Sequence, residues 1–293
     1  MPDNPQAAPD HWFRLSDHRL VSLEGRDAVA FAQAQTMNDV AALEDGHWQW
    51  SGWLTAKGRV IALFGLARIA SDTVWLVVPD ADADALADRL RRFVFRSKVA
   101  ISVRDDLRIA GRLRASDLAS GNHWAGDPAT AIELDLSGGP TGRSLRIGPA
   151  VTAADDPAAL AAWRREDLAH GWPRLEAAQS ELWTPQQLSL ERLQAFSVRK
   201  GCYPGQEIVA RTHFLGQAKR GLALIHGDTP FLPGDPLQDG TGDAGTVVST
   251  AGMLALAVVT GGSGATTPPG NDGSPAAGGA SWRYGTLLGG LAR

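Results

Sequence analysis

Residues 47–78 read HWQWSGWLTAKGRVIALFGLARIASDTVWLVV, and this stretch is rich in β-branched and aromatic residues. Such residues fit the pleated, half-buried surface of a strand, whereas glycines and prolines between the runs favour turns. The sequence therefore predicts three strands in one sheet, covering His47 to Thr55, Arg59 to Ile69 and Thr73 to Val78.

Helix and strand patterns flank this stretch on both sides. Before it, an apolar run from Leu20 to Leu23 precedes a helical spacing of apolar residues between Ala28 and Gln35. After it, one apolar helical stripe runs from Ala81 to Arg96, and the alternation from Val99 to Val103 is typical of a strand. The order strand, helix, strands, helix, strand predicts an α+β lobe.

A second group of elements follows. Weaker strand signals lie at Leu107 to Leu113 and at Thr130 to Leu136. The helix from Pro157 to His170 is the best marked in the chain, because Asp156 can cap its start and Gly171 suits the residue just past its end.

The C-terminal part, from residue 221 to residue 293, predicts a small all-β domain. Its expected strands are Gly221 to Ile225, Ala244 to Thr250, Met253 to Thr260 and a last one near Trp282 to Leu288. Residues 261–280 are almost entirely Gly, Ser, Thr, Pro and Ala, so we expect a flexible loop there. Residues 1–12 carry prolines and acids without an apolar region and are predicted to be a disordered tail.

Composition excludes several function classes. With 44% hydrophobic and 20% charged residues, the 293-residue chain can bury a substantial core. A net charge of −4 argues against nucleic-acid binding by bulk electrostatics, and no apolar run is long enough to span a membrane. The histidines lack metal-ligand spacing, and one cysteine cannot form an internal disulfide or hold an iron–sulfur cluster alone. We therefore expect a cytoplasmic protein that binds no metal by itself.

The one cysteine lies in the run Arg199-Lys200-Gly201-Cys202-Tyr203-Pro204-Gly205-Gln206-Glu207. Two adjacent cations favour the thiolate, and Pro204-Gly205 is typical of a turn that could present it to a cleft. The alternative is that Cys202 is a small buried hydrophobe and that the turn has no further role.

This run resembles the signature of the YgfZ-type folate-binding proteins, which are relatives of the glycine-cleavage aminomethyltransferase, or T-protein. Other positions match the family in the same order, and the resemblance covers roughly Leu15 to Thr260. The matching positions are Gly25-x-Asp27-Ala28, Phe31-x-Gln33-x-Gln35-x-x-x-Asp39-Val40, Lys57-Gly58-Arg59, Pro185-Gln186, Val209-Ala210-Arg211 and Lys219-Arg220.

The resemblance implies an α+β fold in which a T-protein-like ring of two α+β lobes and a small antiparallel C-terminal β-barrel surrounds a folate pocket. Residues 13–220 would form the two-lobed folate-binding domain and residues 221–293 the barrel domain. It further implies a monomer that binds tetrahydrofolate or a related folate. Its protein partners would be iron–sulfur proteins or their assembly factors, including a tRNA-modifying enzyme.

Glycine-cleavage chemistry is not expected. The aminomethyltransferases carry a carboxylate pair shortly after the glycines that match Lys57-Gly58-Arg59, and Ala62 and Leu63 stand in the corresponding positions here. A hydrocarbon side chain can neither activate the folate nitrogen nor stabilise a charged intermediate. Chemistry would instead involve Cys202 as a thiolate, with the neighbouring motif residues Lys200, Tyr203, Gln206 and Glu207.

Folate recognition is expected from an aromatic face for the pterin and cations for the glutamate tail. Trp163 matches a family position that contacts folate, and His18 stands where a second aromatic contact is expected. An acid found in many relatives is missing, because this chain has Ala169-His170-Gly171 there. The other candidate folate-binding residues are Asp39, Lys57, Arg59, Arg96, Lys98 and Arg211.

Two other functions stay open. The chain could be a folate-dependent one-carbon transferase that uses another acid, such as Asp39. It could also be a binding scaffold without chemistry of its own, in which Glu207 and Arg211 form structural ion pairs.

Overall fold

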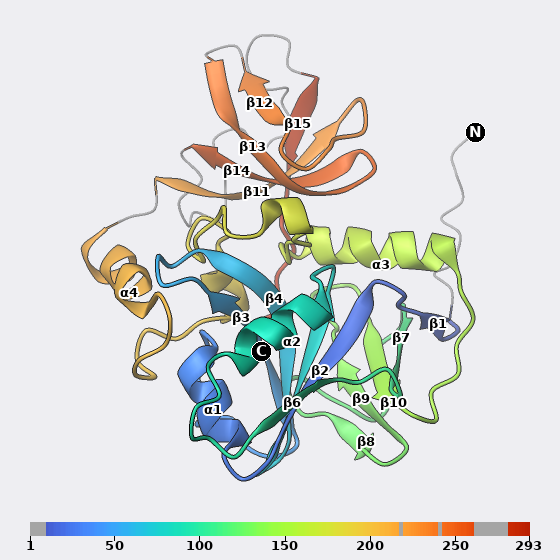
Figure 1. Cartoon of the computed structure of the whole chain (residues 1–293). Helices are drawn as coiled ribbons and strands as arrows, with labels where there is room; N and C mark the ends of the chain where they lie inside the picture. The colour runs from blue at the N-terminus through green and yellow to red at the C-terminus, as the bar shows by residue number, and fades with distance from the viewer. Residues whose placement is uncertain (1–9, 217–218, 240–241, 261–280) are drawn as a thin grey trace.

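The computed structural model describes residues 10–216, 219–239, 242–260 and 281–293. It contains three antiparallel sheets of five strands each, so the chain has the mixed helix-and-sheet architecture that the sequence predicts. Figure 1 shows the C-terminal sheet at one end of the molecule, with helix α3 (Pro157–Ala169) between it and the other two sheets. The predicted loop 261–280 and most of the predicted tail lie outside the described residues.

The first sheet contains the aromatic and β-branched residues 47–78. Its strand order is β3 (His47–Leu54), β4 (Val60–Ala70), β5 (Thr73–Pro79), β2 (His18–Glu24) and β6 (Ala100–Val103). The three strands predicted within residues 47–78 are confirmed, and they pair in one sheet. Antiparallel pairing suits them because consecutive strands are joined by short turns.

Two helices, α1 (Ala28–Gln35) and α2 (Ala83–Arg91), pack on one face of this sheet through a core of their own. Helix α2 ends at Arg91, five residues before the predicted end at Arg96. The amides of Phe93 and Val94 bond three residues back, to Leu90 O and Arg91 O, and this tighter geometry terminates the helix.

The second sheet has the order β1 (Phe13–Arg14), β7 (Arg108–Arg112), β10 (Ser144–Gly148), β9 (Ala131–Asp135) and β8 (Ala125–Asp127). The sequence predicts only β7 and β9; β1 and β8 have two and three residues, and β10 closely follows the turn-forming residues 138–142. The inner face of this sheet contributes Ile109, Ile132, Leu134, Leu145 and Ile147 to the largest core, which it shares with the first sheet and α3.

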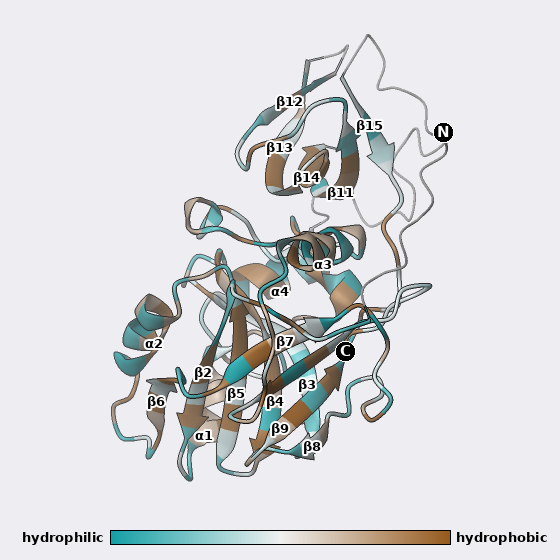
Figure 2. Ribbon diagram, turned by 90° about the vertical axis from the view of Figure 1, so that its right-hand side faces the viewer, coloured by the Kyte–Doolittle hydropathy of each residue, from teal (hydrophilic) through white to brown (hydrophobic). Residues whose placement is uncertain are grey.

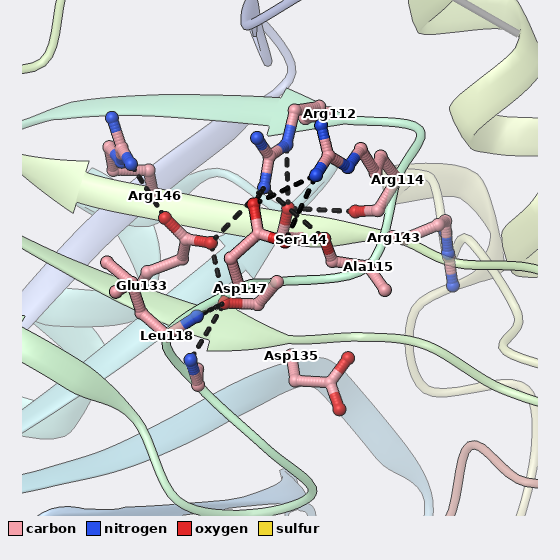
Figure 3. Close-up of polar contacts among 12 residues, drawn as sticks. Arg112, Arg114, Ala115, Asp117, Leu118, Glu133, Asp135, Arg143, Ser144 and Arg146 are labelled. Carbon is pink, nitrogen blue, oxygen red and sulfur yellow. Dashed lines mark hydrogen bonds and ion pairs between the residues drawn. The ribbon is translucent and has the colours of Figure 1, made fainter. Parts of the chain in front are cut away.

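The outer face of the second sheet is charged and holds the start of the described chain. The buried carboxylate of Glu133 pairs with Arg146 at 2.7 Å and Arg112 at 3.5 Å, as Figure 3 shows. The two guanidinium carbons lie 4.3 and 4.7 Å from the ring centroid of Trp12. Residues 10–12, part of the predicted tail, therefore include one side chain held by cation–π contacts.

The C-terminal sheet has the order β12 (Pro236–Asp239), β13 (Gly242–Ala251), β14 (Leu254–Thr260), β11 (Arg220–Gly227) and β15 (Trp282–Gly285). Its edge strands β12 and β15 are joined by a hydrogen bond from Trp282 Nε1 to Gln238 O, 3.0 Å long. One face of the sheet has its own core, and the other adds Leu222 and Val258 to the main core. Figure 2 shows the hydrophobic residues of β13 and β14 at this end of the molecule.

A buried ion cluster joins elements that are far apart in sequence. Arg174, with 5% of its side chain exposed, binds Asp17 Oδ2 at 2.7 Å, Asp167 Oδ2 at 3.0 Å and both carboxylate oxygens of Asp80. These acids come from the turn before β2, from α3 and from the end of β5. Burial opposes the charge on Arg174, but the three carboxylates outweigh it and raise its pKa. For Asp17, burial is outweighed by His18, Arg174 and Arg164, which hold its pKa well below the ordinary value.

We expect Arg174→Met to lower the free energy of unfolding by about 3–5 kcal/mol, because it leaves three buried carboxylates without their shared cation. Urea unfolding of the two proteins at neutral pH measures the difference. Arg14→Met is the matched control, since Arg14 is 57% exposed and lies 3.8 Å from Asp155; we expect it to change stability by less than about 0.5 kcal/mol. Equal effects of the two variants would contradict the structural role of the ion cluster.

Candidate functional site

An aromatic pocket lies between the first two sheets and α3. The centre of a water-sized sphere can reach only about 20 Å³ of it, and the empty space among its side chains is about 360 Å³ when open solvent at the mouth is included. Tryptophans from three segments line it: Trp48 and Trp50 on β3, Trp163 on α3, and Trp172 just past the end of α3. The ring centroids of Trp50 and Trp172 are 4.0 Å apart and those of Trp48 and Trp50 are 5.0 Å apart. The remaining lining residues are His18, Gly65, Val77, Pro79, Leu134, Leu136, Leu145 and Asp167.

Local sequence explains how these rings reach one pocket. Trp48 and Trp50 are two residues apart on a strand, so they share a face. Gly111 on β7 lies beneath Trp163, and a Cβ there would be 2.9 Å from Cε3 of the indole. The glycine therefore lets the ring pack against the sheet. The indole N–H of Trp50 donates to Leu291 O at 2.7 Å, which ties the C-terminal segment to the pocket.

Asp167 gives the pocket one fixed carboxylate. It lies four residues after Trp163 on α3 and is 4% exposed, and its Oδ1 accepts a 2.6 Å hydrogen bond from Arg143. Arg143 is fully buried, and its guanidinium carbon lies 4.7 Å from the ring centroid of Trp163. Figure 3 shows Arg143 apart from the Glu133 cluster, and its Nε and Nη2 have no partner among the described residues.

The side chains are of the kinds that bind a flat heterocycle, but the rings of Trp50 and Trp172 stack on each other, so a ligand ring would have to displace one of them. Indole faces stack on such a ring, and a carboxylate oriented by two arginines can accept hydrogen bonds from adjacent N–H groups. The rest of the lining is mostly apolar, so it would hold the ring away from water.

Two of the residues predicted to contact folate, Trp163 and His18, line this pocket. His18 Nδ1 lies 2.6 Å from Asp17 Oδ1. The other predicted contacts do not line it. Arg59 donates to Leu182 O and Gln187 Oε1, and Asp39 accepts from Gln33. Lys57, Arg96, Lys98 and Arg211 are exposed at the surface.

Sequence reasoning missed Trp48, Trp50, Trp172 and Asp167. The alternation of Trp48 and Trp50 in a predicted strand, and the four-residue spacing of Trp163 and Asp167 in a predicted helix, were the available signals. His170, in the segment where the family acid is missing, is buried, with Nε2 2.9 Å from Gly138 O.

The cysteine motif forms a second part of the site. Cys202 is exposed, so the alternative of a buried hydrophobe is wrong. Lys200 Nζ turns inward and donates to Thr36 O at 2.5 Å and Asn38 O at 2.8 Å. Burial lowers the pKa of Lys200 to about 7, against the opposing effect of Asp39. Tyr203 donates its hydroxyl to Ser197 O, and burial raises its pKa to about 12.

The turn after Cys202 packs on the predicted Lys57-Gly58-Arg59 segment. Gly205 has φ +79°, and a Cβ there would lie 2.5 Å from Thr55 O. A glycine is therefore required both by the left-handed backbone and by the close approach. Gln206 begins α4 (Gln206–Leu215), which the sequence did not predict, and Glu207 in its first turn is exposed.

Within the described residues, no three His, Cys, Asp or Glu side chains are grouped to hold a metal ion. None of the described helices is long and apolar enough to cross a membrane.

The fold places the chain in a known class. The glycine cleavage system aminomethyltransferase T from Bartonella henselae matches 85% of this chain and 78% of its own, with a TM-score of 0.67 and 17% identity. The aminomethyltransferase fold is thus the class to which this architecture belongs.

Sequence comparison gives the family. The chain is 30% identical to the tRNA-modifying protein YgfZ of Cronobacter sakazakii, over 80% of this chain and 78% of that protein. It is 26% identical to the protein of that name from Colwellia psychrerythraea, over 83% and 80% of the two chains. No family model matches. The chain belongs to the YgfZ family, as the resemblance of its cysteine motif predicts.

The buried position of Lys200 predicts a pH-dependent stability. Its pKa falls from 10.5 to about 7 on folding, so between these values the unfolded chain binds more protons than the folded one. The stability of the wild type relative to Lys200→Met should therefore rise as the pH increases from 7 towards 10. Urea midpoints of both proteins across this range test it. A constant difference between them would contradict the lowered pKa.

Proposed function

We propose that this protein binds tetrahydrofolate or a related reduced folate in the aromatic pocket and supports the assembly or repair of iron–sulfur enzymes, including tRNA-modifying ones. The observation that carries the proposal is that the carboxylate of Asp167, held by Arg143, lines a pocket together with four tryptophans. A pterin is flat and carries an amino group next to ring N–H groups, so it matches both features.

Asp167 can supply the carboxylate that the resemblance leads us to expect in the segment of Ala169, where this chain has none. Ala169 removes the carboxylate expected near the pterin, but Asp167 lies two residues earlier on the same helix and lines the pocket. In our proposal Asp167 accepts the pterin hydrogen bonds, and Arg143 and Arg174 hold its carboxylate in one orientation. The tryptophan rings would move apart to admit the pterin, because the space between them takes only about 20 Å³, and the rest of the folate would extend from the mouth.

Aminomethyl transfer does not fit this site. Ala62 and Leu63 are buried hydrocarbon side chains on β4, with 2% and 3% of their surface exposed. The alternative of a one-carbon transferase based on Asp39 is weakened, because Asp39 does not line the pocket and accepts a hydrogen bond from Gln33 instead.

The exposed thiol suits a role towards a partner protein. One thiolate cannot hold a cluster, but it can supply a single ligand or a redox group while the partner supplies the other thiolates. We propose iron–sulfur proteins or their assembly factors as these partners, and a cytoplasmic monomer as the working form. Two α+β lobes and a C-terminal β-barrel would then form a ring around the folate. In the alternative, a binding scaffold without chemistry of its own, the protein would dock its partner through its surface, and Cys202 would have no role.

Folate binding is tested first. We expect 5-formyltetrahydrofolate to quench tryptophan fluorescence saturably, and Asp167→Asn to raise its Kd about 10- to 100-fold, as for a lost hydrogen bond to a charged group. Glu166→Gln is the control, since this neighbour on α3 does not line the pocket. Circular dichroism shows whether the variants are folded. No binding by the wild type at millimolar ligand, or unchanged binding by folded Asp167→Asn, would overturn the proposed pocket.

The thiol is tested in cells that lack the native gene. We expect Cys202→Ser to bind 5-formyltetrahydrofolate like the wild type but to fail to restore the tRNA modification made by an iron–sulfur enzyme, because serine is a poor cluster ligand and has no comparable redox chemistry. The modified nucleoside is measured by mass spectrometry of total tRNA. Full restoration by Cys202→Ser would favour the scaffold.

A further inference from the structure

One buried residue, Asn38, is hydrogen-bonded both to the aromatic pocket and to residues 200–205, the thiol loop, which carries Cys202. It lies between α1 and β3 and is 7% exposed. Its Nδ2 donates to Trp50 O at 2.8 Å and to Gln194 O at 2.7 Å. Trp50 is a wall of the pocket, so the amide of Asn38 is bonded directly to the main chain that carries that wall.

The other side of Asn38 faces the thiol loop. Its carbonyl oxygen accepts the 2.8 Å hydrogen bond from Lys200 Nζ, two residues before Cys202. Its side-chain Oδ1 accepts from the amide of Asp39 at 2.9 Å, which fixes the side chain relative to its own backbone. Every polar side-chain atom of Asn38 is therefore engaged, and the residue has one orientation.

Gln33 on α1 reinforces the same connection. Its Nε2 donates to Lys200 O at 3.1 Å and to Asp39 Oδ1 at 3.0 Å, while its Oε1 accepts from the amide of Val40 at 2.7 Å. Both the ammonium and the carbonyl of Lys200 are thus bonded to the segment around Asn38. A displacement of that segment would move the loop that carries Cys202.

We propose that Asn38 is a positioning residue that couples ligand binding in the pocket to the exposure and reactivity of the Cys202 thiol. The proposal rests on the proposed binding of folate. A ring stacked on Trp50 changes the position of that residue, and the two hydrogen bonds of the Asn38 amide pass the change to its own backbone and from there to Lys200. Energetic coupling between sites can be carried by packed side chains and hydrogen-bond networks that have two discrete arrangements.

The single cysteine makes the coupling measurable. Because the chain has one thiol, the rate of alkylation by iodoacetamide reports Cys202 alone. We expect saturating 5-formyltetrahydrofolate to change this rate at least 5-fold in the wild type, within the range common for coupled sites. In Asn38→Ala the ligand should still quench tryptophan fluorescence, but the alkylation rate should change less than 2-fold.

Two controls keep the test decisive. Asn122→Ala removes an exposed asparagine and should retain the wild-type response. Lys200→Met breaks the next step of the same connection and replaces Asn38→Ala if that variant does not fold; it should also lose the response. A full response in Asn38→Ala, or in Lys200→Met, would overturn the proposal.

The two measurements distinguish failure of the proposed folate binding from failure of the proposed coupling. Saturable fluorescence quenching without any change of the wild-type alkylation rate would overturn the coupling and leave the proposed function intact. Absence of quenching would overturn the folate proposal itself.

Discussion

The buried guanidinium of Arg174 is the constraint on which the site depends. It binds carboxylates from the turn before β2, the end of β5 and helix α3, and each of these segments contributes lining residues to the pocket. A buried charge is costly unless it is paired and hydrogen-bonded. The three segments must therefore converge on one point, which fixes the distance between the first sheet and α3 and so the width of the pocket.

The aromatic pocket and the Cys202 thiol lie in different surroundings. The pocket is apolar and aromatic, with one carboxylate, whereas the thiol lies exposed on a loop outside it. The loop is seated by a glycine against the turn after β3 and by an ammonium against the segment after α1. Cys202 can thus meet a partner while its position is set by buried contacts. An exposed but firmly seated thiol is what a shared cluster ligand would require.

The strands of residues 47–78 followed from their runs of β-branched and aromatic residues, and the helix from residue 157 followed from the capping signals at its two ends. Strands β1 and β8 did not, since they have two and three residues, and neither did β10, which closely follows the turn-forming residues 138–142, GGPTG. Helix α4 was not predicted, because Pro204-Gly205, directly before it, indicated only a turn. For the site, the motif predicted Cys202, and the resemblance predicted Trp163 and His18. Asp167 was missed because the resemblance directed attention to Ala169-His170-Gly171 and not to the preceding turn of the same helix.

By itself, the sequence determined the local elements, the family and the position of the one cysteine, because these depend on residues close together in the chain or on a motif of fixed spacing. Only the tertiary structure decided that Trp48, Trp50, Trp163 and Trp172 share one pocket, that Asp167 is its carboxylate and that Asn38 bridges the pocket and Lys200. Such groupings join residues more than a hundred positions apart. They arise when buried charges and hydrogen-bonding groups find their partners as the sheets pack, and no local pattern records them.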